Sequence, residues 1–262
     1  MDLVSSSQLR IHNCFRSRYL PAERDLIVYL PPGYDQEARA QFPVLYLHDG
    51  QNLFDSATAF AGVDWRVGQT ANRLIAEGRV QPLVVVGIYN TGKRRIREYT
   101  PTRNRKLGGG GADSYSRMLR KEIKPFIDSK YRTLSGAANT GLGGSSLGGL
   151  LTLYIGLKFP DDFGRLAVLS PSVWWDKRWI LYYAEKKRIA GRPRMWLDVG
   201  TAEGGTNAQL VRKFYDILVT RGWKAGVDLE YNEFEGGQHN EAAWAQRVGP
   251  FLQFLFPAVE AV

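Results

Sequence analysis

Short runs of β-branched and aliphatic residues recur along the chain, separated by longer stretches with helical periodicity. Continuous apolar runs such as "PVLYLHD" and "PLVVVGIY" indicate strands that are buried on both faces, as in a parallel sheet covered by helices. The predicted strands span residues 25–30, 43–49, 82–89, 139–144, 165–170, 194–200 and 227–234. The predicted helices span roughly residues 65–78, 114–129, 147–158, 177–189, 207–221 and 241–255.

This alternation of strands and helices predicts an α/β fold with an open, mostly parallel central sheet of about eight strands flanked by helices. No helix is predicted between the first strands, which indicates that these strands pair antiparallel at the start of the sheet. No repeat divides the chain, and "GGGG" at 108–111 reads as a local flexible loop, so we expect a single domain over residues 1–262. Functional residues of such folds gather in loops at the carboxyl ends of the strands.

Composition narrows the class of protein. No apolar run is long enough to span a membrane, and the N-terminus lacks the pattern of a signal peptide. Cys14 is the only cysteine, which rules out an internal disulfide and any cysteine-based metal cluster and fits a cytoplasmic protein. The net charge of +9 favours anionic partners, but no nucleic-acid-binding motif accompanies it.

The segment "TGLGGSSLGGL" places five glycines around two serines, between a predicted strand and a predicted helix. It lacks the third glycine of a dinucleotide fingerprint and the lysine of a phosphate-binding loop. It fits the nucleophile elbow G-x-S-x-G, in which small residues permit a strained turn that exposes the serine hydroxyl. Ser145 fails this pattern because Leu147 follows two residues later. Ser146 fits it, with Gly144 and Gly148, and is the candidate nucleophile.

A serine hydroxyl needs a base, which is usually histidine, and elbow enzymes carry their partners in the order serine, acid, histidine. Of the three histidines, only His239 follows Ser146, so His239 is the candidate base. Glu203 lies just beyond a strand end and is the candidate acid. Asp198, within the same predicted strand, is the fallback, although a strand aspartate is more often structural. His48 is expected to shape a loop.

Acyl transfer also requires hydrogen-bond donors for the oxyanion that develops on the substrate. The backbone N–H of Leu147, directly after the nucleophile, is one candidate. The second is expected from the loop after "VLYLHDG", and the sequence leaves Gly50 and Gln51 open.

Together these residues resemble the putative-esterase group of the α/β-hydrolase fold, which includes enterochelin, feruloyl and acetylxylan esterases, S-formylglutathione hydrolases and mycolyltransferases. The resemblance covers most of the chain, from "VYLPPGYD" through "PVLYLHDGQNLFD", "GGSSLGGL", "LSPSVWW" and "DVGTAEG" to "GGQH". It implies Ser146 as nucleophile and His239 as base, and it places the acid at Glu203 where aspartate is commoner. No subfamily matches cleanly.

Two further loops lie near the expected site. "SPSVWWDKRW" offers Trp174 and Trp175 for stacking on a sugar or an aromatic acyl group, with Trp175 expected to face the pocket and the other tryptophan to be buried. In the arginine-rich loop after "VVVGIYN", Arg95 and Arg97 are candidates for binding an anionic substrate group.

The sequence therefore predicts a serine carboxylic ester hydrolase that needs no metal or cofactor and works through an acyl-enzyme. The expected substrates are small-molecule or carbohydrate esters of carbohydrate-linked, aromatic-acyl or siderophore type, with no nucleic-acid or membrane partner. Two alternatives use the same residues or the same fold. One is an acyltransferase with the same three residues, and the other is a catalytically silent carbohydrate-binding domain.

Overall fold

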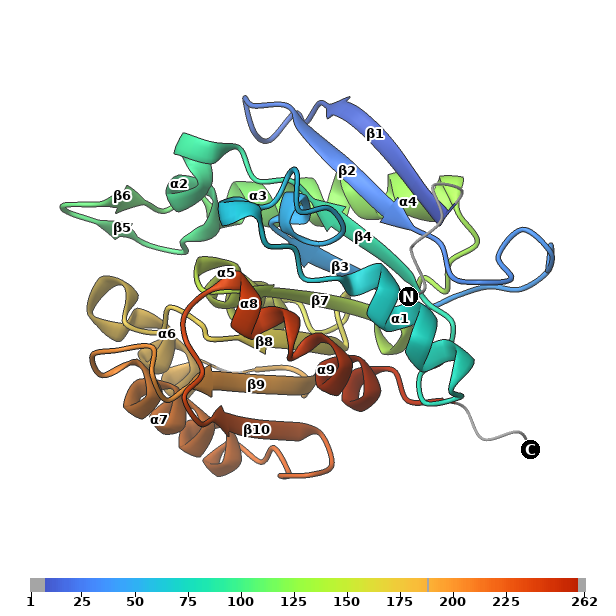
Figure 1. Cartoon of the computed structure of the whole chain (residues 1–262). Coiled ribbons are helices and arrows are strands. Elements are labelled where there is room, and N and C mark those ends of the chain that lie inside the picture. Colours follow the sequence, from blue (N-terminus) through green and yellow to red (C-terminus); the bar gives the residue numbers. More distant parts are fainter. Residues whose placement is uncertain (1–7, 188, 259–262) are drawn as a thin grey trace.

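A computed structural model of the protein describes residues 8–187 and 189–258. Its centre is an eight-stranded sheet in the order β1-β2-β4-β3-β7-β8-β9-β10 (Figure 1). Pairing is antiparallel between β1 and β2 and between β2 and β4, and parallel throughout the rest. The strands are β1 (Leu9–Phe15), β2 (Arg24–Tyr29), β3 (Val44–His48), β4 (Val84–Ile88), β7 (Thr140–Ser145), β8 (Arg165–Leu169), β9 (Arg194–Gly200) and β10 (Leu229–Phe234).

Helices cover both faces of this sheet, as the buried strands require. Those on one face are α3 (Ala112–Met118), α4 (Lys124–Lys130), α5 (Leu147–Lys158), α6 (Trp175–Lys186) and α7 (Asn207–Thr220). The opposite face, nearer the viewer in Figure 1, carries α1 (Val67–Ala76), α8 (Glu241–Ala245) and α9 (Val248–Leu255). A mostly parallel sheet between two helical layers confirms the predicted α/β-hydrolase-type fold.

Alternation along the strands assigns side chains to the two cores. In β4, Val84, Val86 and Ile88 pack into the core beneath α3 and α5, whereas Val85 packs into the core beneath α1 and α9. Because successive side chains point to opposite faces of a strand, a strand with helices on both sides must be apolar at every position. This requirement explains the uninterrupted apolar runs of the sequence.

The strand β1 and the short helix α2 (Arg95–Tyr99) were not predicted from the sequence. Strand β1 is the half-exposed edge of the sheet, so its polar side chains give no buried-strand pattern. The predicted helix at 241–255 is broken at residues 246–247 into α8 and α9, and the one at 114–129 passes through a π-helical turn at Leu119–Ile123.

The glycines at 108–111 do not form a loose loop. They belong to a small hairpin of β5 (Arg103–Asn104) and β6 (Gly108–Gly109), which extends from the body of the molecule beside α2 (Figure 1). A Cβ atom on Gly109 would lie 2.3 Å from Thr100 Oγ1, and one on Gly111 would lie 2.6 Å from Arg97 O. Glycine is therefore required because the hairpin packs directly on its neighbours.

Candidate active site

Ser146 occupies a strained turn between β7 and α5. Its φ of 57° and ψ of −119° are unfavourable for a residue with a side chain. Two backbone hydrogen bonds to the neighbouring strand end hold this turn, from Ser146 N to Leu169 O and from Ser172 N to Ser146 O, both 3.0 Å. A Cβ on Gly144 would lie 3.1 Å from the carbonyl carbon of Gly148, and one on Gly148 would lie 3.3 Å from Asp49 Oδ2, so both elbow positions are closely packed.

The structure brings Ser146, His239 and Glu203 into one chain of hydrogen bonds. Ser146 Oγ lies 2.9 Å from His239 Nε2, and His239 Nδ1 lies 2.9 Å from Glu203 Oε2. Since a carboxylate only accepts hydrogen bonds, the Nδ1–H group donates to Glu203, and Nε2 is left to accept the serine proton. Ser172 Oγ also lies 3.3 Å from Ser146 Oγ.

The side chain of Glu203 is almost completely buried beside the exposed imidazole of His239. Its Oε1 accepts hydrogen bonds from the Ser170 hydroxyl and from Gly200 N, and Asn207 Nδ2 donates to Oε2 over 2.9 Å. Burial raises the pKa of Glu203, but hydrogen bonds from His239, Ser170 and the Gly200 backbone outweigh it and keep the pKa below its ordinary value. An ionised Glu203 is suited to hold an imidazole and to stabilise its charged form.

Asp198, the alternative acid, lies beneath this chain and makes no contact with His239. It is fully buried and accepts hydrogen bonds from Arg247 Nη1 at 2.6 Å and from Trp196 Nε1 at 2.7 Å. Burial raises the pKa of Asp198 to about 6 in spite of the Arg247 guanidinium. Asp198 therefore holds Arg247 in place and lies outside the hydrogen-bonded chain to His239.

Arg247 and the Ser170 hydroxyl link the two carboxylates, since Arg247 Nη1 donates to Asp198 and Arg247 Nη2 lies 3.7 Å from Glu203 Oε1. Ser170 Oγ accepts hydrogen bonds from Trp244 Nε1 at 3.0 Å and from Arg247 Nη1 at 2.8 Å, and it donates to Glu203. These bonds use its one proton and both lone pairs, so its direction is fixed. Ser170, Arg247 and Trp244 were missed by the sequence analysis, since no motif marks them and Arg247 lies in a stretch that reads only as helix.

The loop after β3 forms the opposite wall of the site. Asp49 adopts a left-handed conformation with φ of 58° and accepts two hydrogen bonds of 2.7 Å from the Arg95 guanidinium and one of 2.7 Å from Asn90 Nδ2. Burial raises the pKa of Asp49, but Arg95 outweighs this and lowers it below the ordinary value. Gln51 Oε1 accepts from Asn90 N at 3.2 Å, so the loop is tied to the end of β4.

The candidate oxyanion donors lie around this wall. Leu147 is the first residue of α5, so its N–H has no partner within the helix. Gln51 lines the cavity of the site. Gly50 is buried against β4, where a Cβ would lie 2.6 Å from the carbonyl carbon of Gly87.

Ser146 and His239 open into a cavity of about 410 Å³. Arg95 lines the cavity, but its Nε and Nη2 groups already donate hydrogen bonds to Asp49. Phe60 is a largely exposed aromatic ring at the cavity, and Trp244 packs edge-on against His239, with ring centres 5.0 Å apart. Glu241 also lines it, and burial raises the pKa of this carboxyl.

The expectation that Trp175 faces the pocket is wrong. Trp175 is buried, and its Nε1 donates to Thr102 O at 3.2 Å, whereas Trp174 is 46% exposed. The cause is Gly109, whose missing Cβ would lie 2.8 Å from the Trp175 ring, so the hairpin closes over that indole. Arg97 faces a different cavity from the one that holds Ser146.

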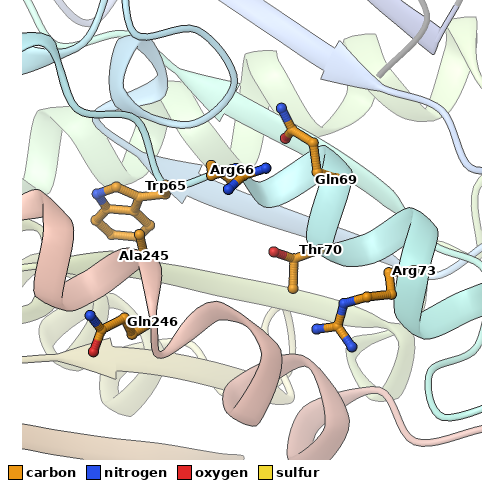
Figure 2. A pocket seen from close by; sticks show the side chains of 7 residues that line it. All are labelled: Trp65, Arg66, Gln69, Thr70, Arg73, Ala245 and Gln246. Atoms are coloured by element: carbon orange, nitrogen blue, oxygen red, sulfur yellow. The ribbon is translucent and has the colours of Figure 1, made fainter. Parts of the chain in front are cut away.

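A further cavity of about 540 Å³ lies between α1 and the α8–α9 region, behind the wall of the site (Figure 2). It is larger than the cavity at Ser146 but contains none of the three hydrogen-bonded residues. Trp65 forms part of its lining, and the Trp65 ring packs against Trp244 with centres 6.1 Å apart.

His48 is fully buried and lies 3.0 Å from the Tyr115 hydroxyl through Nδ1, as expected of a residue that shapes the structure. Burial lowers the pKa of His48 to about 3. Among residues 8–187 and 189–258, no group of three or more His, Cys, Asp or Glu side chains is arranged to hold a metal ion. In the same part of the chain, no helix has both the length and the apolar character needed to cross a bilayer.

Fold and site together define an α/β hydrolase, and comparison with known proteins narrows the class. The family described as "Putative esterase" matches residues 17–254, so the chain belongs to this family. It is a carboxylic ester hydrolase.

Three similar proteins illustrate the range of the family. The ferri-bacillibactin esterase BesA of Bacillus subtilis is 29% identical over 224 residues, which cover 76% of this chain and 74% of BesA. An endo-1,4-beta-xylanase/feruloyl esterase of Xylanibacter ruminicola is 27% identical over 235 residues, 87% of this chain but 29% of that longer protein. The crystal structure of the BES protein from Bacillus cereus superposes with a TM-score of 0.75 at 21% identity, covering 98% of this chain and 97% of that one.

Proposed function

We propose that Ser146 is the nucleophile of this esterase, His239 its general base and Glu203 the carboxylate that orients His239. The observation that carries the proposal is the unbroken hydrogen-bonded path, with 2.9 Å from Ser146 Oγ to His239 Nε2 and 2.9 Å from His239 Nδ1 to Glu203. The buried, ionised Glu203 supports it, because a positive imidazolium forms beside this carboxylate during the reaction.

The reaction runs in two halves. Ser146 Oγ attacks the ester carbonyl carbon while its proton passes to His239 Nε2, and the tetrahedral intermediate then breaks the bond to the alcohol, which takes that proton from His239. A water molecule then gives a proton to His239 and attacks the acyl carbon, and the second tetrahedral intermediate breaks the bond to Ser146 Oγ, which takes the proton back from His239 as the acid is released. The N–H of Leu147 and an N–H of the Gly50–Gln51 loop bind the oxyanion in both halves.

As substrates we propose small-molecule esters of siderophore type or of aromatic acids, including carbohydrate-linked ones. The names of the relatives support these classes, since one is a ferri-bacillibactin esterase and another carries a feruloyl esterase activity in its name. The cavity supports them too, because Phe60 and Trp244 offer aromatic surface beside the polar side chains of Asn52 and Glu241.

The two adjacent serines of the elbow provide the test. A fluorophosphonate probe should label the wild-type protein and the Ser145→Ala variant, but not Ser146→Ala. In Ser146→Ala, the rate of p-nitrophenyl acetate hydrolysis should fall by at least about 10³-fold. A cooperative thermal unfolding transition should show that this variant is still folded. Wild-type turnover in Ser146→Ala would exclude Ser146 as the nucleophile. Comparing kcat/KM for methyl ferulate, feruloylated arabinose and a catecholate trilactone then tests the substrate class.

A further inference from the structure

A second cavity, here called the basic groove, lies on the other side of the segment that borders the active site. It has a volume of about 510 Å³ and is formed by the chain near residues 19–21, by α2 and by the β5–β6 hairpin. Gly92 and Arg95 line the catalytic cavity, whereas Lys93, Arg94 and Arg97 line the groove. The two cavities are therefore separated by a single turn of chain.

The groove carries a strong excess of positive charge. Lys93, Arg94, Arg97 and Arg103 line it, and none of them forms an ion pair or a side-chain hydrogen bond with another residue of the described ranges 8–187 and 189–258. Arginine side chains in a protein normally find an acceptor when one is close, and the planar guanidinium matches a carboxylate with two parallel hydrogen bonds. These side chains are available to an external anion.

Its one acidic lining residue is Glu98, which is buried. Glu98 Oε2 accepts hydrogen bonds from Arg24 Nη1 at 3.2 Å and from the Thr91 hydroxyl at 3.0 Å. Glu98 Oε1 has no hydrogen-bond partner among the described residues, although it is buried. Because this oxygen is sealed from solvent, a ligand in the groove cannot reach it, and Glu98 adds no accessible negative charge to the lining.

The remaining walls are apolar and firmly held. Pro21, Ile96 and Leu107 line the groove, and the last two expose 39% and 52% of their surface. The hairpin that carries Leu107 is held by Gly110 N, which donates to Thr100 Oγ1 at 3.1 Å, and by the close glycine packing described above. A ligand would therefore meet a preformed surface of apolar faces and cations.

We propose that the basic groove binds a carboxylate-bearing oligosaccharide, such as a chain of uronic acids, that forms the alcohol part of the ester. Such a chain combines carboxylates for the arginines with apolar ring faces for Ile96 and Leu107. A single-stranded nucleic acid fits less well, because it relies on stacking against aromatic rings, of which the groove lining offers only Tyr19. The proposal rests on the proposed function, since the bound chain presents its ester to Ser146.

Binding is measured by calorimetry with a hexamer of galacturonic acid, which contains no ester and so tests the groove independently of catalysis. The wild-type protein should bind it, with affinity that falls as salt is raised, and should bind neutral xylohexaose at least 10-fold more weakly. Arg97→Glu and Arg103→Glu should each weaken binding of the acidic hexamer by at least 10-fold. Lys213→Glu, on exposed α7, makes the same charge change elsewhere and should alter it less than twofold.

Equal losses in Lys213→Glu would overturn the proposal, because they would indicate a response to net charge only. Tighter binding of hexathymidylate than of the acidic sugar would overturn it in favour of nucleic acid. A kinetic comparison completes the test. The groove variants should lose at least 10-fold in kcat/KM toward a feruloyl ester of an acidic oligosaccharide and keep wild-type hydrolysis of p-nitrophenyl acetate; an equal loss on both esters would contradict a substrate-binding groove.

Discussion

The active site has two walls, and each is built on a buried aspartate–arginine pair. On the side of β8–β10, Asp198 and Arg247 lie beneath the hydrogen-bonded chain from Ser146 to Glu203. On the side of β3 and β4, Asp49 and Arg95 hold the loop that contains Gln51. The first pair is sealed from solvent, whereas the Arg95 side chain is 26% exposed at the cavity.

The two pairs support different parts of the site. The first pair supports the carboxylate that binds His239, because Arg247 Nη2 lies 3.7 Å from Glu203 Oε1 and Arg247 Nη1 donates to Ser170, which in turn donates to Glu203. The second pair acts directly on the backbone, because Asp49 itself adopts the left-handed conformation that starts the loop. We therefore expect changes in the first wall to separate catalysis from stability, and changes in the second wall to alter the position of the oxyanion donors.

The largest effect is expected from Glu203→Gln. An amide cannot stabilise the imidazolium as a carboxylate does and permits the wrong imidazole tautomer, so kcat for p-nitrophenyl acetate should fall by about 10³-fold or more. Glu203→Asp keeps the charge and should recover part of the rate. A Glu203→Gln variant with nearly wild-type kcat would show that the imidazole is oriented by another group.

Asp198→Asn should reduce the free energy of unfolding strongly and kcat only weakly, the opposite of what is expected for Glu203→Gln. Replacing Asp198 removes the closest carboxylate of the buried Arg247, which keeps only Glu203 Oε1 at 3.7 Å, so the free energy of unfolding should drop by about 3 kcal/mol. Urea unfolding gives this value, and kcat measured on the folded fraction should fall far less than in Glu203→Gln. A larger loss of kcat than of stability would reverse the roles of the two carboxylates.

Arg95→Gln tests the second wall. Without the paired hydrogen bonds to Asp49 the loop should shift, and misplaced donors should lower kcat by about 10- to 100-fold with a smaller change in KM. Arg94→Gln, one residue away and facing the basic groove, is the matched control for a simple ester. Should Arg95→Gln raise KM alone, Arg95 would instead contact the substrate.

The last prediction concerns the pH dependence of stability. Because burial lowers the pKa of His48 to about 3 from the ordinary 6.5, the unfolded chain binds a proton between these values that the native protein does not. Stability from this group is complete above pH 6.5 and falls on acidification by about 1.4 kcal/mol per pH unit. His48→Gln should remove that part of the slope in urea titrations between pH 6 and 4; an unchanged slope would assign it to other groups.

Sequence alone predicted the fold, and it selected three residues that the structure brings into hydrogen-bonding distance, for definable reasons. Strands buried on both faces leave long apolar runs, and the elbow needs glycines on both sides of Ser146. With only His239 downstream and Glu203 just past a strand end, the order along the chain left few choices.

What the sequence did not predict depends on packing between distant segments. The roles of Ser170 and Arg247 arise only when β8 and the start of α9 meet, and neither residue belongs to a motif that sequence reasoning can recognise. Trp174 and Trp175 are adjacent and chemically identical, so only the approach of the hairpin at Gly109 decides which indole is covered. Helix α2 is too short and too basic to produce an apolar stripe.

The strained turn at Ser146 has a neighbour in the same condition. Ser170 at the end of β8 also has a positive φ, of 43°, and the backbone bonds from Ser146 N to Leu169 O and from Ser172 N to Ser146 O couple the two corners. Because these bonds tie the two turns together, the strained backbone at Ser146 cannot relax unless the backbone at Ser170 changes as well. Substitutions at Ser146 and Ser170 should therefore have non-additive effects on the free energy of unfolding. Placing the nucleophile at another position of β7 would also require a change at the end of β8.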